Sequence, residues 1–145
     1  MIQWENERKM LEQRFAFLQA LSFHGPDAGV VASKLVGDSL LLRYDNAALK
    51  RQINIAYSKG SERTNRSIVI TILAGKLSFL LDDYLNSIGR SEFQPAFAGS
   101  PNGATEAEFV DAAAAAFQKI ATGPLARTLA GLEWPSVDFD WKGMR

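Results

Sequence analysis

The stretch from residue 51 to residue 85 constrains the fold of this chain more than any other. The first part of this stretch, residues 51–57, alternates between apolar and polar side chains, and this period of two predicts a strand with one solvated face. The apolar face carries Ile53, Ile55 and Tyr57. We therefore expect a β-sheet that meets the core with one face and meets water with the other at this strand.

A second strand is predicted over residues 67–73, after a polar loop. Five successive β-branched residues occupy positions 68–72, and such a run is typical of a strand covered on both faces. We therefore place this strand at the centre of the sheet. Leu77 and Phe79 predict a third, shorter strand, and a short helix is expected to begin near Asp82.

An amphipathic helix is expected over residues 3–22, where apolar side chains recur at helical spacing. The helix should end near His24, because Gly25 can adopt the left-handed cap and Pro26 cannot continue a helix. This pattern predicts a helix that covers the sheet, with His24 as a capping residue.

A β-hairpin is predicted between this helix and the central stretch. Residues 30–36 and 40–44 form its two strands, and Gly37 and Asp38 form its turn. Because the connections between successive strands are too short for parallel crossovers, the strands should form an antiparallel meander.

The C-terminal part is predicted to be helical after a surface loop at 91–103. Thr105 and Glu108 have the spacing of a capping box, and Gly123 ends the helix. One or two further turns follow within residues 125–132. The expected apolar face of the long helix comprises Phe109, Ala112, Ala113, Ala116, Phe117 and Ile120.

These elements predict one α+β domain over residues 1–145. It consists of an antiparallel meander of about four to five strands, packed by an N-terminal helix and C-terminal helices.

Charge and composition exclude several classes of function. The chain holds 16 basic and 16 acidic residues, whereas proteins that bind nucleic acid or anionic membranes usually carry a basic excess. It has no cysteine and therefore forms no disulfide. No apolar run approaches the roughly 20 residues that span a bilayer, and the N-terminus lacks a signal core. We expect a cytoplasmic protein that contacts neither nucleic acid nor membrane.

Motifs for catalysis are incomplete in this chain. Residues 37–40 spell Gly-Asp-Ser-Leu, the nucleophile motif of a class of hydrolases, but the only histidine, His24, precedes the motif, and Ser39 falls next to the expected hairpin turn. One histidine without cysteines does not predict a zinc site. No glycine-rich phosphate loop is present. We expect no catalytic residue, no metal and no cofactor.

Two polar or aromatic segments are candidates for binding a partner. The first is a charged hairpin tip with Arg63 and Arg66, which is either a solvated loop or a recognition loop. The second is a C-terminal tail that interleaves aromatic and acidic residues, and it either closes the core, the default for aromatic residues, or serves as an interface. Its candidates are Trp134, Asp138, Asp140 and Trp141.

Residues 51–57, 68–73 and 79–85 also carry a family resemblance. Their order resembles the immunity proteins of bacterial polymorphic toxin systems, in particular those of contact-dependent growth inhibition. The resemblance implies an N-terminal helix, a strand meander and C-terminal helices, and a function in binding and blocking a cognate toxin domain.

Three functions remain as hypotheses. The first is a toxin-neutralising immunity protein, and the second is another protein-binding adaptor or a secretion chaperone. The third is a small hydrolase or ligand-binding enzyme that uses Asp82, Asp83 and Tyr84. A negative charge at the start of a helix explains the two aspartates without catalysis.

Overall fold

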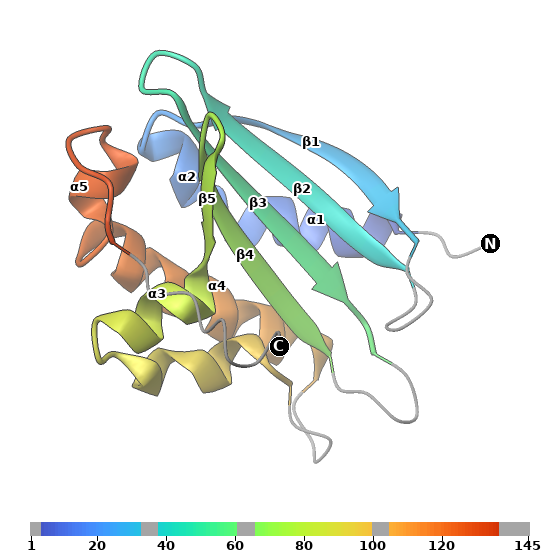
Figure 1. Ribbon diagram of the computed structural model, residues 1–145. Helices are drawn as coiled ribbons and strands as arrows, with labels where there is room; N and C mark the ends of the chain where they lie inside the picture. The colour runs from blue at the N-terminus through green and yellow to red at the C-terminus, as the bar shows by residue number, and fades with distance from the viewer. Residues whose placement is uncertain (1–3, 33–37, 61–65, 100–104, 137–145) are drawn as a thin grey trace.

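The computed structural model describes residues 4–32, 38–60, 66–99 and 105–136. Five antiparallel strands form one sheet in the order β1-β2-β3-β4-β5, and helices α1, α2 and α4 lie on one face of it (Figure 1). The strands are β1 (His24–Val31), β2 (Ser39–Asn46), β3 (Arg51–Ser58), β4 (Ser67–Ala74) and β5 (Leu77–Leu80). The helices are α1 (Glu5–Arg14), α2 (Phe17–Ala20), α3 (Leu81–Ser87), η1 (Ser91–Phe97), α4 (Glu106–Thr122) and α5 (Ala126–Leu129). The predicted fold class, an antiparallel meander with N-terminal and C-terminal helices, is confirmed.

The N-terminal helix is shorter than predicted and is interrupted. The chain leaves α1 at Phe15, resumes a helical turn in α2, and turns out of it at Ser22, whose φ of 73° is left-handed. The buried Asn46 side chain holds this corner, because its amide donates to the Ser22 carbonyl at 3.0 Å and its side-chain oxygen accepts from the Leu49 N–H at 3.1 Å.

His24 opens strand β1 and does not cap a helix, so both that prediction and the strand start at residue 30 are wrong. Pro26 lies within β1, which is an edge strand, and edge strands tolerate a missing N–H donor. The predicted turn residue Gly37 lies outside the described residues.

Strand β4 is covered on one face only, contrary to the prediction. Ile68, Ile70 and Ile72 are buried against the helices, whereas Val69 between them is 46% exposed. The β-branched residues suit extended backbone on both faces, but the helices pack on the inner face alone (Figure 1). The middle strand of the sheet is β3, with β4 next to it.

The region after the sheet is more regular than predicted. Strand β5 and helix α3 form as expected, and η1 occupies most of the predicted surface loop. Phe97 at its end is buried in the core, which explains why this segment folds against α3 and α4.

Helix α4 begins at the predicted capping box. The Thr105 hydroxyl accepts from the Glu108 N–H at 3.2 Å, and the Glu108 carboxylate accepts from the Thr105 N–H at 3.4 Å. Its buried face includes Phe109, Phe117 and Ile120, but Ala112 is exposed, unlike in the predicted face. The Phe117 ring lies 6.3 Å from the Phe15 ring, so α4 and the N-terminal helices form one layer.

Tyr44 on the inner face of β2 leads to a stability prediction. Its side chain is fully buried, and its hydroxyl has no hydrogen-bond partner within the described residues. A buried hydroxyl without a partner costs about 1–3 kcal/mol of desolvation. We therefore expect Tyr44→Phe to raise the free energy of unfolding by about 1 kcal/mol at neutral pH, as measured by urea denaturation. An unchanged or lower midpoint would show that the hydroxyl is satisfied.

Burial of Tyr44 also leads us to expect that the free energy of unfolding falls at alkaline pH. Burial, and secondarily the charge of Glu12, raises the pKa of Tyr44. Because the folded pKa lies above the unfolded value of about 10, the contribution of Tyr44 to stability is constant below that pH and falls above it, as the unfolded chain ionises first. Tyr44→Phe should lose less stability than the parent between about pH 9 and 11 in matched urea series. If the unfolding free energies of the two proteins fell equally with rising pH, ionisation of Tyr44 would not be the cause of the loss.

Candidate functional site

The face of the sheet opposite α1 and α4 is left uncovered by the described helices (Figure 1). Strand register arranges its side chains in two neighbouring rows across the sheet, which we call the open face. The apolar row is Gly29, Leu41, Ala56 and Val69, and the polar row is Asp27, Arg43, Asn54, Thr71 and Leu80.

The apolar row keeps part of its area in water. Val69 is 46% exposed, and Leu41 and Ala56 in the same row are half-buried. Leu80, which pairs with Thr71 at the edge of the neighbouring row, is 41% exposed. Successive strands lie about 4.8 Å apart, so these side chains form one contiguous apolar strip across four strands. Such a strip is the kind of surface that a protein partner buries.

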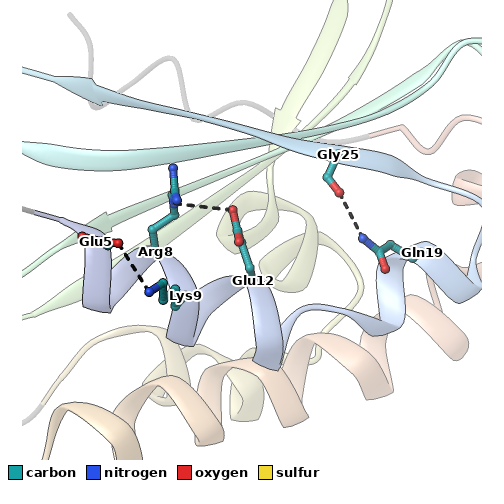
Figure 2. Close-up of polar contacts among 6 residues, drawn as sticks. All are labelled: Glu5, Arg8, Lys9, Glu12, Gln19 and Gly25. Carbon is teal, nitrogen blue, oxygen red and sulfur yellow. Dashed lines mark hydrogen bonds and ion pairs between the residues drawn. The ribbon is translucent and has the colours of Figure 1, made fainter.

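Three charged groups lie next to the strip. Asp27 and Arg43 face each other across β1 and β2, and Asp45 follows on the same side of β2. No ion pair within the described residues involves any of the three. On α1, by contrast, Glu5 pairs with Lys9 at 3.4 Å and Arg8 pairs with Glu12 at 3.8 Å (Figure 2).

Three shallow hollows follow the open face and share lining residues. One of ≈ 210 Å³ contains Leu41 and Arg43, and one of ≈ 390 Å³ contains Asp27, Arg43 and Asp45. A third, of ≈ 450 Å³, contains Asp45 and Leu73 near the β4–β5 turn. Because neighbouring hollows share Arg43 or Asp45, the face is a continuous uneven surface suited to a partner's side chains.

Trp134 lies away from the open face. Its ring packs 5.0 Å from the Phe79 ring, and the Arg51 guanidinium lies 5.3 Å from its centre. It is half-buried against the core, in agreement with the interpretation that aromatic residues of the tail close the core. The other tail candidates, Asp138, Asp140 and Trp141, lie outside the described residues.

The hairpin tip supplies one described residue, Arg66, since Arg63 lies outside the described part of the chain. Arg66 is half-buried before β4, and its carbonyl accepts from the Gly99 N–H at 2.7 Å. Trp134 contacts Phe79, which pairs with Ile72 near the other end of β4. The structure therefore does not bring Arg66 and Trp134 into one site.

The residues considered for catalysis are also dispersed. Ser39 pairs with Val31 at one end of the β1–β2 ladder, while His24 pairs with Asp45 at the other end. This separation agrees with the rejection of the Gly-Asp-Ser-Leu motif as a nucleophile site.

Asp82 borders a cavity of ≈ 110 Å³ whose other lining residues are apolar. Partial burial of its carboxyl, followed by the charge of Asp83, raises the pKa of Asp82, although the side chain reaches the surface. Tyr84 stacks on Phe79 at 5.5 Å in the core. The cavity thus offers one carboxyl group between apolar walls.

Two features are absent from residues 4–32, 38–60, 66–99 and 105–136. No group of three or more histidine, aspartate or glutamate side chains there is arranged to hold a metal ion. No helix of these segments has the length and apolar character required to cross a membrane.

The sequence predicted a solvated face at β3 but missed that this face continues over β4, because the β4 pattern predicted cover on both sides. The alternation of polar side chains at Gln52 and Asn54 in β3 was the available signal, since it indicated a solvated face across the whole sheet.

No protein-family model, curated protein or solved structure matches the chain.

Proposed function

We propose that the protein is a toxin-neutralising immunity protein that holds a cognate toxin domain against the open face. The observation that carries the proposal is the apolar strip containing Val69 and Leu80 on an uncovered sheet. Protein interfaces combine apolar area with polar groups at its border, and the open face sets an apolar row directly beside a polar one. The resemblance in the central strands supplies the kind of partner.

The charged groups of the open face restrict the partner further. Asp27 and Asp45 carry two negative charges and Arg43 carries one positive charge, with no ion pair among the described residues to neutralise them. A toxin domain with basic side chains opposite the two aspartates pairs with these charges. Charge pairs of this kind contribute chiefly to specificity and to the rate of association.

A lysine in place of Val69 tests the contact surface. The ammonium group should lower affinity for the toxin at least about tenfold, because it stays hydrated where the partner requires an apolar contact. The measurement is calorimetric titration of a purified toxin domain identified by sequencing the reading frames next to the gene, together with growth protection in cells that express that toxin. The matched control is Leu77→Lys, since Leu77 is 56% exposed but lies outside the open face.

Both variants should melt at the parent temperature, because each changes a side chain that water already contacts. Full affinity of Val69→Lys would contradict the open face as the interface. If the parent protein neither binds nor neutralises the neighbouring toxin, the proposed function itself is wrong.

A further inference from the structure

The outer edge of β4 is covered in two places, with a gap between them. Strand β5 pairs with residues 71–74, and Ala98 beyond η1 forms an isolated bridge with Ser67. Residues 68–70 lie between these two contacts and line the cavity of ≈ 110 Å³ that Asp82 borders, which we call the edge cavity. The cavity exists because β5 is too short to reach the start of β4.

The edge cavity has an apolar floor and an open mouth. The floor is made of four apolar residues that are only 2–4% exposed: Ile68, Ile70, Leu81 and Phe97. The other three lining residues, Val69, Leu80 and Asp82, are exposed, so the cavity reaches the surface between them. Val69 and Leu80 also belong to the apolar strip, so the cavity adjoins the surface that we assign to the toxin.

Size and lining limit what the edge cavity can hold. Pockets for cofactors and drug-sized ligands usually measure about 300–1,000 Å³, so a cavity of ≈ 110 Å³ suits one side chain. A polar or charged tip at the floor would lose its water without gaining a partner, because the four floor side chains offer no donor or acceptor. The floor therefore selects an aliphatic group.

The mouth adds a negative charge that has no partner. Within the described residues, the Asp82 carboxylate makes no hydrogen bond and no ion pair. Its backbone is held, since the Gln94 amide donates to the Asp82 carbonyl at 3.1 Å and to the Asn86 Oδ1 at 2.9 Å. Partial burial, followed by the charge of Asp83, raises the pKa of Asp82. A cation at the mouth would favour the ionised carboxylate.

We propose that the edge cavity seats one aliphatic side chain of the toxin domain, and that a basic residue beside it in the toxin pairs with Asp82. This inference rests on the proposed function for the identity of the partner, and it adds the chemistry of one anchor point. Anchors of this kind, an apolar group in a pocket with a charge at its border, carry a large share of binding energy in protein interfaces.

Binding of n-butylammonium, 1-butanol and pentanoate at neutral pH tests the cavity without any toxin. The three probes share a butyl chain and differ in charge, and the NMR shifts of residues 68–70 report their binding. The ammonium should bind with a dissociation constant below about 50 mM and at least about threefold more tightly than the alcohol, because it pairs with Asp82. Pentanoate should bind most weakly. Methylammonium, which lacks the butyl chain, should not shift these residues.

Asp82→Asn tests the charge at the mouth, first with the probes and then with the toxin. The ammonium and the alcohol should bind this variant equally. The purified toxin domain should bind it about tenfold more weakly than the parent, because the toxin's basic residue loses its partner. Changing that lysine or arginine of the toxin to methionine should then cause no further loss, as a double-mutant cycle measures.

Asp83→Asn is the matched control, since it removes the same charge one residue away and Asp83 is not among the described lining residues. Its affinity for the toxin should fall less than about threefold. Both variants should melt at the parent temperature, because neither carboxylate has a partner within the described residues. An affinity loss at Asp82 with unchanged melting is a result that a purely structural role would not give.

Four outcomes overturn the proposal or its premise. The absence of any shift with the butyl probes overturns the cavity as a binding site, and equal binding of ammonium and alcohol to the parent overturns the role of Asp82. Parent affinity of Asp82→Asn for the toxin overturns the anchor point. If the parent itself does not bind the toxin, the proposed function is wrong, whereas the probe series still decides the chemistry of the cavity.

Discussion

Ile70→Asp should cost roughly 4–5 kcal/mol of folding free energy and move the midpoint of urea denaturation far below that of the parent protein. Ile70 is 2% exposed on the inner face of β4, directly opposite Ile55 of β3. A carboxylate there is buried among aliphatic side chains without a partner. The loss is a large share of the stability of a typical domain, about 5–15 kcal/mol. Urea denaturation followed by circular dichroism measures it.

Val69→Asp is the matched control, because it places the same charge one residue away on the same strand. Val69 faces the open side and is 46% exposed, so the carboxylate keeps its water and should cost less than about 1 kcal/mol. Equal losses in the two variants would contradict the one-sided cover of β4. An unchanged midpoint in Ile70→Asp would contradict the assignment of its inner face.

Arg51→Met should lower the free energy of unfolding by roughly 2–3 kcal/mol. The Arg51 Nε donates to the Thr128 carbonyl at 2.7 Å and Nη2 donates to the Glu133 carbonyl at 3.1 Å. The guanidinium also lies over the Trp134 ring. One side chain at the start of β3 thus holds the segment after α4, and methionine replaces only its apolar stem. Thermal and urea melts provide the measurement.

Two control variants test whether the loss of stability comes from the hydrogen bonds and ring contact of the Arg51 guanidinium. Arg43→Met changes an arginine on the neighbouring strand that has no ion pair within the described residues, and it should shift stability by no more than about 0.5 kcal/mol. Arg51→Lys should recover less than half of the loss, because an ammonium group cannot reproduce the planar fork that reaches two carbonyls. A lysine variant as stable as the parent would show that charge alone is sufficient.

The sheet was predictable wherever local patterns matched tertiary burial. Ile53, Ile55 and Tyr57 alternate with polar residues, and all three are fully buried in β3. The capping box at Thr105 and Glu108 marked the start of α4 correctly, because a cap depends on residues within one helical turn.

The N-terminal part was harder to predict because tertiary contacts override its local signals. The sequence His24-Gly25-Pro26 is typical of a break in structure, but pairing with β2 makes it the start of a strand. The continuous helical periodicity of residues 3–22 conceals the interruption after Arg14. Phe15 within the interruption and Phe17 at the start of α2 both pack near Phe117 of α4, at 6.3 Å and 6.0 Å between ring centres.

The candidate site depended on a distinction that sequence could not make. Val69 and Ile70 are both β-branched and strand-forming, so their chemistry does not reveal which one faces the helices. Register decides it, because Ile70 pairs with buried Ile55 while Val69 pairs with half-exposed Ala56. The open face therefore emerged only when five strands were placed side by side.

The meander also determines which part of the protein can fold first while the chain is being synthesised. Each strand pairs with the next in the chain, so the sheet can close once residue 80 has been made. Helix α4, whose Phe109 ring lies 6.3 Å from that of Tyr57, is complete only at Thr122, 42 residues later (122 minus 80). At about 5–20 residues per second this interval lasts roughly 2–8 seconds. During those seconds the inner face of the sheet lacks the cover that α4 supplies, so the nascent chain is more prone to aggregate than the finished protein.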